Sequence, residues 1–395
     1  MADMDMVRFN GWSSGANNAA QENRLPEGAA RELVNLDPAK GGTLELRPGF
    51  EHELQVDNLR AAFAFGERIV FVDGVQVKVF DPRGGVQLLG GVPAAGVIAG
   101  AELNGKLYLS ALGERYVYDG QVLNAWGAEP PVIRVSAVAG SLPAGVYKLA
   151  ATVVDGEGFE SGAQVTIIHL SAGSGLSVTT ADPRTLRLYA SPADSHTLYD
   201  QGTFASGTVL GNVVVDTLDL DTANLVPMPE VAMLATAGGM LFGARERYLF
   251  RTEPMRPHLH DRVRGFYQFQ SDIKLLAPVE GGIYVVTADC TYFISGLAGD
   301  QESQRRVHEF GAIAGTFARL PDGRATWFCE YGQVVGDALG QVQLLNQGSF
   351  LPDTAPAGAA GLLNHNGLQS AVTSMRGAVR RNGIAVSDSW TLEVL

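Results

Sequence analysis

A short pattern returns along the chain about every forty residues. It consists of a glycine turn, a strand of alternating apolar residues, a polar turn and a strand rich in aromatic residues. Its starts, in chain order, are Gly66, Gly105, Gly239, Gly282 and Gly323. The first two starts are 39 residues apart, the third and fourth 43, and the fourth and fifth 41. This period, with several short strands in each unit, is typical of a β-propeller.

The physical reason for such a repeat is burial. One small sheet cannot bury both of its faces alone, whereas sheets stacked radially bury each face against a neighbour and leave only short edges. The 48 glycines and 18 prolines also favour many turns over long helices. We therefore predict an all-β protein whose main body is a β-propeller of five to seven blades. Unrelated hairpins in a β-sandwich are the alternative, but they do not account for the near-constant period.

One interval breaks the period. Gly105 and Gly239 are 134 residues apart, about 95 more than one unit. The extra segment begins near Pro130 and Pro131, ends near Pro227, and contains about seven short alternating stretches. That number of strands in that length is typical of an immunoglobulin or fibronectin-like β-sandwich. The sequence thus predicts a sandwich domain inserted between two blades.

The predicted organisation has four parts. Residues 1–20 form an N-terminal arm, and residues 21–128 the first part of the propeller. Residues 129–229 form the inserted sandwich, and residues 230–395 the second part of the propeller with a C-terminal closing segment. Within the first part, Pro- and Gly-rich residues between Glu32–Leu36 and Thr43–Leu46 predict a short hairpin.

The chain is acidic, with a net charge of −13. Binding to phosphate groups needs clustered Lys and Arg side chains. The negative net charge therefore argues against a protein that binds nucleic acid over its whole surface. An acidic wall is still compatible with DNA that slides past without sticking. Cys290 and Cys329 each lie in an apolar strand pattern, so we expect two buried free thiols and neither a disulfide framework nor a zinc site.

Chemistry-bearing motifs are sparse. His258 and His260 could share one strand face, but no third metal ligand follows at a recognisable spacing, so a loop with two solvated histidines is the preferred interpretation. Asp216, Asp219 and Asp221 lack the glycine and the closing glutamate of a calcium loop. No Walker motif or nucleophile elbow is present. We expect no catalytic residue, no metal and no cofactor, and hence a protein that is not an enzyme.

We also expect no secretory signal and no membrane-spanning segment. The N-terminal residues are acidic where a secretory signal needs basic ones, and no apolar run approaches the ~18 residues of a membrane span. We expect a protein that is made in the cytoplasm, does not span a membrane, and leaves the cell only as part of an assembly.

The N-terminal region carries a resemblance. Gly15-Ala16-Asn17-Asn18 is followed by a Leu-Pro-x-Gly turn at Leu25–Gly28 and by a hairpin with Asn35, Asp37, Arg47, Pro48 and Gly49. In this order the elements resemble the start of tail nozzle or tail-tube-tip virion proteins of tailed bacteriophages, the tail tubular protein B-like type. Residues 381–394 are similar to the end of the same proteins. Together these motifs cover roughly 50 residues.

The resemblance implies a function and partners. It implies a ring of copies of this chain, a hexamer, at the distal tail, around a channel through which genome DNA passes without sequence-specific binding. It also implies contacts with other tail proteins such as adaptor, tube or fibre proteins. The location would be the virion tail, after assembly in the host cytoplasm. The alternative function is that of a glycan-binding or glycan-processing β-propeller, whose site would lie among convergent loops.

Contacts with other subunits are expected in the N-terminal arm and in the hairpin from Arg24 to Phe50, because both precede the repeated body and carry the resemblance. For the hairpin, closing the propeller is an equally good interpretation. The candidate interface residues are Phe9, Trp12, Asn17, Asn18, Arg24 and Arg47.

Overall fold

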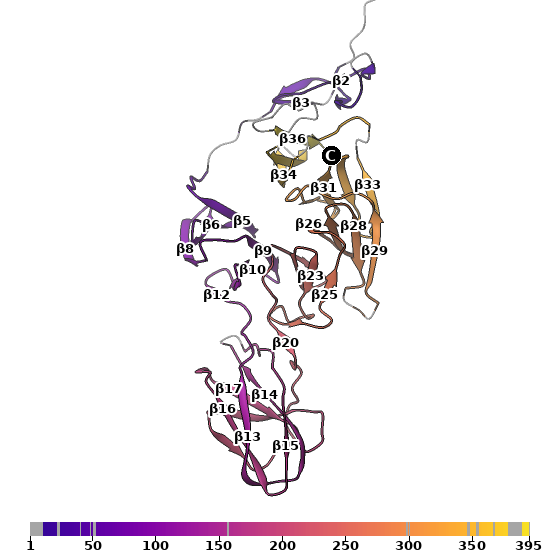
Figure 1. The fold of residues 1–395 in the computed structure, drawn as a ribbon. Helices are drawn as coiled ribbons and strands as arrows, with labels where there is room; N and C mark the ends of the chain where they lie inside the picture. The colour runs from indigo at the N-terminus through magenta and orange to yellow at the C-terminus, as the bar shows by residue number, and fades with distance from the viewer. Residues whose placement is uncertain are drawn as a thin grey trace, which may run out of the picture. The chain divides into compact units, whose positions relative to one another are not determined.

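The computed structural model describes residues 11–21, 24–39, 41–47, 49, 53–155, 158–297, 299, 301–345, 348–352, 355–365, 368–377 and 389–394. Within these residues the regular elements are β-strands, and no α-helix is present. Almost all strand pairs are antiparallel (Figure 1). The all-β prediction is confirmed.

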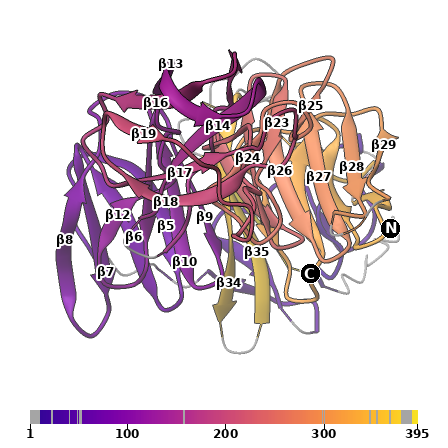
Figure 2. The same ribbon diagram turned by 90° about the horizontal axis from the view of Figure 1, so that it is seen from below.

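Five sheets of the described residues share one construction, in which four strands are hydrogen-bonded to their neighbours in chain order. Figure 2 shows the first sheet with its strands side by side. The first two sheets are β5 (Leu59–Phe65), β6 (Arg68–Asp73), β7 (Gln76–Asp81), β8 (Gly85–Gly91), and β9 (Ile98–Leu103), β10 (Lys106–Ala111), β11 (Glu114–Tyr118), β12 (Leu123–Ala125). The third is β21 (Met233–Ala237), β22 (Met240–Arg245), β23 (Tyr248–Arg251), β25 (Phe266–Gln268). The fourth and fifth are β26 (Ile273–Val279), β27 (Gly282–Thr287), β28 (Thr291–Ser295), β29 (Ser303–His308), and β30 (Ala318–Arg319), β31 (Ala325–Cys329), β32 (Gly332–Gly336), β33 (Val342–Leu344).

Each of these sheets is a β-propeller blade, and the fold is of the β-propeller class, as the repeat predicts. The glycine that starts each repeat lies at the turn between the first and second strand of a blade, except Gly282, which is the first residue of the second strand. Gly105 and Gly239 adopt φ angles of 71° and 74°, in the left-handed region that favours glycine. A three-stranded sheet follows the fifth blade, built from β34 (Ala357–His365), β35 (Leu368–Arg376) and β36 (Ser389–Val394).

The chain divides into two compact units, one of residues 58–270 and one of residues 1–57 with 271–395. In the first unit, strand β10 contributes to the cores on both sides of its blade. Leu107 and Leu109 pack with the first blade. Tyr108 packs with Met228, in the segment that leads into the third blade, and with Leu241 in β22 of that blade. Successive side chains of a strand point to opposite faces, so one strand serves two blade interfaces.

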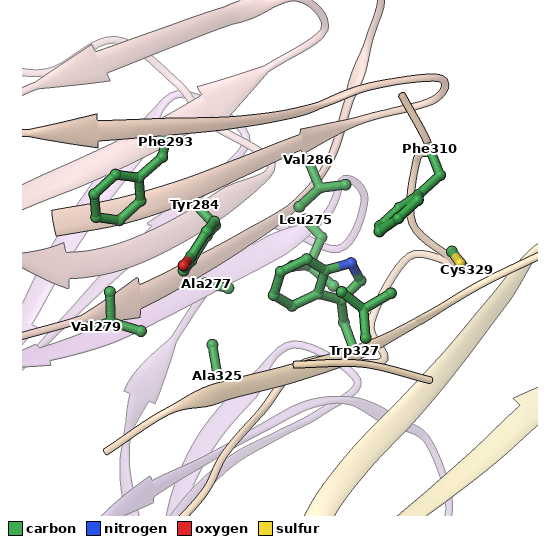
Figure 3. Close-up of a cluster of buried hydrophobic side chains, with 11 residues drawn as sticks. Leu275, Ala277, Val279, Tyr284, Val286, Phe293, Phe310, Ala325, Trp327 and Cys329 are labelled. Atoms are coloured by element: carbon green, nitrogen blue, oxygen red, sulfur yellow. The ribbon is translucent and has the colours of Figure 1, made fainter. Parts of the chain in front are cut away.

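In the second unit, strand β31 does the same. Trp327 is fully buried between the fourth and fifth blades, where its ring centroid lies 5.4 Å from that of Tyr284 (Figure 3). The next residue, Phe328, packs on Met375 of the three-stranded sheet. Cys329 belongs to the Trp327 cluster, and Cys290 is buried as well. Both thiols are buried, as predicted.

The insert between the second and third blades consists, in its described residues, of seven strands in two sheets. They are β13 (Ile133–Leu142), β14 (Gly145–Val153), β15 (Thr166–Leu170), β16 (Ser174–Thr180), β17 (Leu186–Ala190), β18 (Tyr199–Phe204) and β19 (Thr208–Leu210). The sheet orders are β13-β16-β19 and β15-β14-β17-β18. Both sheets contribute to one core, with Leu149 and Leu188 from one and Leu176 and Val178 from the other. The two-sheet architecture and the strand number agree with the sequence prediction.

The strand order of the insert differs from that of immunoglobulin constant domains. Immunoglobulin constant domains place their first, second, fourth and fifth strands in one sheet. Here the first, fourth and seventh strands form one sheet and the third, second, fifth and sixth the other. The insert therefore does not have the immunoglobulin strand order. The difference lies in β13 and β16, the first and fourth strands, which pair with each other and form a separate sheet with β19.

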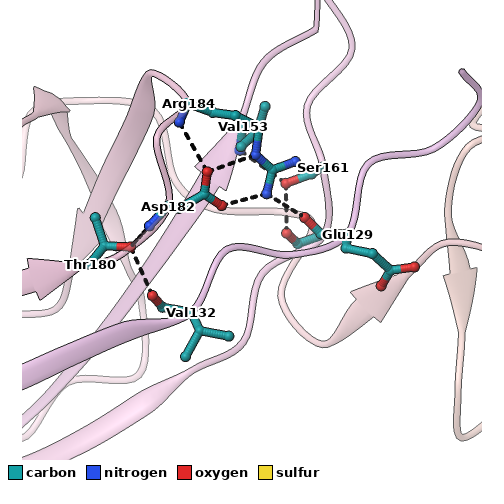
Figure 4. Close-up of polar contacts among 8 residues, drawn as sticks. Glu129, Val132, Val153, Ser161, Thr180, Asp182 and Arg184 are labelled. Carbon is teal, nitrogen blue, oxygen red and sulfur yellow. Dashed lines mark hydrogen bonds and ion pairs between the residues drawn. The ribbon is translucent and has the colours of Figure 1, made fainter. Parts of the chain in front are cut away.

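Polar contacts hold the segment that enters the insert. The guanidinium of Arg184 binds the carboxylate of Asp182 and donates to the backbone oxygen of Glu129 at 3.2 Å (Figure 4). The hydroxyl of Thr180 donates to the backbone oxygen of Val132 at 3.0 Å. At the other end, β20 (Leu225–Val226) pairs with β24 (His260–Asp261) of the third blade's long connection.

Arg115 ties both ends of the insert to the second blade. Its Nη2 lies 2.7 Å from a carboxylate oxygen of Glu129, and its other nitrogens donate to the backbone oxygens of Trp126 and Met228. These acceptors flank the insert on either side in the sequence. One side chain of a blade therefore binds the segments by which the chain leaves for the insert and returns from it.

Candidate functional site: the N-terminal module

Residues 11–47 fold into two small sheets, in the part of this segment that the structure describes. Strand β1 (Gly15–Ala16) runs parallel to β2 (Ala29–Ala30), and β3 (Leu36–Pro38) runs antiparallel to β4 (Leu44–Leu46). The backbone nitrogen of Trp12 donates to the oxygen of Gly42 at 2.6 Å and joins the two sheets. We call residues 11–47 the N-terminal module.

The absence of a side chain at Gly11 allows the two small sheets of the module to lie close together. Its φ is 98°, and a Cβ added there would lie 2.6 Å from the backbone oxygen of Gly42. A side chain at this position would therefore strain the backbone and push the hairpin away. The predicted arm and the predicted hairpin are thus parts of one folded segment.

The hairpin differs in one respect from the prediction. Its second strand, predicted at Thr43–Leu46, is observed at Leu44–Leu46, but the first is Leu36–Pro38 and not Glu32–Leu36. Asn35 has a φ of 55°, a left-handed conformation that interrupts an extended strand. The oxygen of Asn35 accepts a hydrogen bond from the backbone nitrogen of Arg47 at 2.9 Å, so the interruption also closes the hairpin.

Asn17 and Asn18 have different partners within the same chain. Asn17 is 7% exposed, and its Oδ1 accepts from the backbone nitrogen of Ala20 at 2.9 Å. The amide of Asn18 binds the backbone of Leu351 twice, because Nδ2 donates to its oxygen and Oδ1 accepts from its nitrogen, each at 2.8 Å. Asn17 therefore holds a turn inside the module, and Asn18 attaches the module to the loop after the fifth blade.

Arg47 forms an ion pair with Asp37 across the hairpin. Its Nη2 lies 2.8 Å from Oδ1 of Asp37, and its Nε donates to the same carboxylate at 3.2 Å. Both side chains are largely shielded from solvent, with exposed fractions of 16% and 23%. This pair stabilises the hairpin and leaves Arg47 little capacity to bind a further partner.

The remaining predicted interface residues are placed as follows. Trp12 is half-buried, and Arg24 is exposed, with its backbone nitrogen bonded to Gln21. Phe9 lies outside the described residues. The structure thus brings Trp12, Asn17, Asn18 and Arg47 into one module, and whether any of the six residues contacts another subunit stays a prediction.

Sequence reasoning missed the two most exposed apolar side chains of the module. Val34 is 69% exposed and Leu46 is 80% exposed. The alternation of Leu44 and Leu46 suggested a half-buried strand, but a two-stranded sheet has no second layer to cover Leu46. These two side chains are exposed, whereas Asn17 is buried and Asn18 is half-buried.

The two histidines correct another expectation. His260 is buried and His258 is half-buried, and both imidazoles are hydrogen-bonded. Nε2 of His258 donates to the backbone oxygen of Glu160 at 3.1 Å, and Nδ1 of His260 donates to that of Arg251 at 2.9 Å. Burial lowers the pKa of both below the ordinary value of 6.5. The two imidazoles contact different segments of the chain. His258 packs on Phe159 of the insert, and His260 packs on Phe250 of the third blade.

Two further searches cover only the described part of the chain. There, no group of three or more His, Cys, Asp or Glu side chains is arranged to hold a metal ion. In the same residues, no helix is long and apolar enough to cross a membrane.

The sequence matches no protein-family model and no curated protein. Solved structures that resemble it include streptogramin B lyase, at 10% identity and a TM-score of 0.34, with 88% of this chain and 96% of the other covered. AztD from Citrobacter koseri resembles it at 14% identity and a TM-score of 0.28, covering 72% and 84%. Kluyveromyces lactis Hsv2 does so at 10% identity and a TM-score of 0.31, covering 86% and 98%.

Proposed function

We propose that this chain is a structural component of a bacteriophage tail, a nozzle or distal tube protein that forms a ring of copies around the DNA channel. In this proposal it contacts neighbouring tail proteins and has no enzymatic activity. Its blades and its insert supply rigid surfaces, and its N-terminal module supplies an attachment point.

The observation that carries the proposal is the role of the residues behind the resemblance. Asn17 holds a turn, Asn18 clamps Leu351, Asn35 adopts a left-handed conformation, and Asp37 pairs with Arg47. Each of these residues therefore has a role in the local geometry of the module. A resemblance that includes them supports a shared N-terminal fold.

The alternative is a propeller that binds or processes glycans. Such a protein needs convergent polar groups in a concave site. In the described residues, the partly buried Glu160 and the imidazoles of His258 and His260 serve internal bonds, as Glu160 does with Tyr189 at 2.7 Å. This supports the structural function over the alternative.

Electron microscopy of labelled particles tests the proposal. Antibodies against the chain, detected with gold, are applied to phage particles released from cells that carry the gene in its native genome. We expect label at the distal end of the tail, with an antibody against the capsid as positional control. Label that is absent from particles, together with a specific hit of the purified chain on a glycan array, would reject the proposal for the alternative.

A further inference from the structure

A basic turn interrupts the third blade between β24 and β25. The carboxylate of Asp261 accepts hydrogen bonds from the backbone nitrogens of Val263 at 2.7 Å and Arg264 at 3.1 Å. The oxygen of Asp261 accepts a third from Gly265 at 2.8 Å. These bonds fix the turn, and the side chains of Arg262, Val263 and Arg264 are exposed. We call residues 262–264 the basic turn.

The basic turn carries two cations beside an exposed apolar side chain. Arg262 and Arg264 form no ion pair with any residue that the structure describes, which is also true of other exposed arginines such as Arg134 and Arg245. Between the two cations, Val263 is 78% exposed. In a chain with a net charge of −13, two cations beside an uncovered apolar side chain indicate a contact with an acidic partner.

We propose that the basic turn of one copy docks on strand β4 of the N-terminal module of a second copy. This inference rests on the proposed ring. Glu45 of β4 is exposed and has no ion-pair partner among the described residues, and the neighbouring Leu46 is 80% exposed. Charge and apolar surface on β4 are therefore complementary to those of the turn.

The geometry of β4 suits such a contact. In the described residues β4 pairs only with β3, so its outer edge is free. Glu45 lies opposite Asp37 and Leu46 opposite Leu36, which places them on opposite faces of the ribbon. A partner that lies along the free edge reaches both.

The contact joins two different surfaces of the chain. The basic turn belongs to the unit of residues 58–270, and β4 belongs to the other unit. A contact between unlike surfaces repeats from copy to copy, and it closes into a ring when the rotation between copies is a whole fraction of a turn. The basic turn and β4 are thus the two halves of a heterologous interface.

Charge reversal tests the inference on the full chain by sedimentation velocity. We expect the natural chain to self-associate, and R262E/R264E and E45R each to raise the dissociation constant by about tenfold or more. An equimolar mixture of the two variants should associate again, because the intact β4 edge of the first then meets the intact turn of the second. Circular dichroism and thermal melting establish that each variant is folded.

The matched control is R134E/R245E, which changes net charge equally at two exposed arginines without ion-pair partners among the described residues. It should associate like the natural chain. A ring that persists in R262E/R264E, or a mixture that stays dissociated, overturns the inference but leaves the proposed function standing. A natural chain that never self-associates overturns this inference and weakens the ring itself. Loss of binding to short duplex DNA in R262E/R264E, with association unchanged, would assign the turn to nucleic acid and overturn it too.

Discussion

Asn18 binds the backbone N–H and C=O of one residue, Leu351, with both ends of its side-chain amide. Its two hydrogen bonds to Leu351, each 2.8 Å long, join positions 333 residues apart in the sequence. Asn18→Ala would leave both backbone groups of Leu351 without this partner. Because an unsatisfied, partly buried polar group costs about 1–3 kcal/mol, we expect a loss of that order in the free energy of unfolding of the unit that contains it.

Hydrogen exchange measures this effect locally. The amide of Leu351 should lose protection in Asn18→Ala, and thermal melting should begin at a lower temperature. Asn124→Ala is the control, because Asn124 is exposed on strand β12. Unchanged protection at Leu351 would show that the module is not attached there.

The buried histidines predict a pH dependence. Nδ1 of His258 is buried and has no partner among the described residues, so a proton added there would have no acceptor. Burial lowers the folded-state pKa of His258 and His260 below 6.5. The unfolded chain therefore binds more protons than the folded chain just below pH 6.5, and the stability present above that pH is lost progressively as the pH falls.

Melting temperature measured from pH 7.5 down to pH 5 checks this prediction. The natural chain should lose stability below pH 6.5, and H258Q/H260Q should show a smaller loss over the same range. The lowered pKa values of carboxylates such as Asp73 and Asp119 do not interfere, because their effect lies below their ordinary value of 3.8. An equal slope in both proteins would contradict the assignment.

At the scale of elements, Arg115 binds both segments that join the insert to the blades. It is 14% exposed and reaches Glu129, Trp126 and Met228. Arg115→Ala removes hydrogen bonds from a charged donor, each of which contributes about 1.5–3 kcal/mol. We expect lower stability and faster proteolysis at the two segments that join the insert to the blades.

Arg83→Ala is the matched control for this element. Arg83 and its partner Glu67 are 87% and 84% exposed, and an exposed ion pair contributes about 0–1 kcal/mol. Limited proteolysis followed by mass determination should show cleavage near residues 127–132 and 226–230 only in Arg115→Ala. Equal digestion of both variants would mean that other contacts hold the insert.

The elements also show what the sequence could predict. Strand alternation, as in Leu107 and Tyr108, reports which faces are buried, and the repeat of starting glycines reports the blades. The long interval after Gly105 revealed the insert. Pairing between distant segments leaves no such signal: nothing near Asn18 points to Leu351, and nothing in the insert's strands specifies their order in the sheets. The burial of His260 was missed because it depends on Phe250 and Gly265, which the chain brings together only on folding.

At the scale of the whole molecule, the proposal requires many copies of an acidic chain to associate. Like charges on copies with a net charge of −13 repel, so association depends on local complementarity and on apolar contacts. Candidate surfaces are the exposed Leu46 and Val34 of the N-terminal module and the basic turn. The predicted N-terminal arm contributes to the module from residue 11 onward, so its attachment to Leu351 positions that surface on each copy.

The most direct test of the account is the mass and shape of the assembled natural chain. Mass photometry of the purified full-length protein, followed by electron microscopy of the same sample, measures both. The account predicts a discrete species of six copies whose class averages show a closed ring with an open centre. A protein that stays monomeric at every concentration tested, or that forms only open chains or compact dimers, would contradict it.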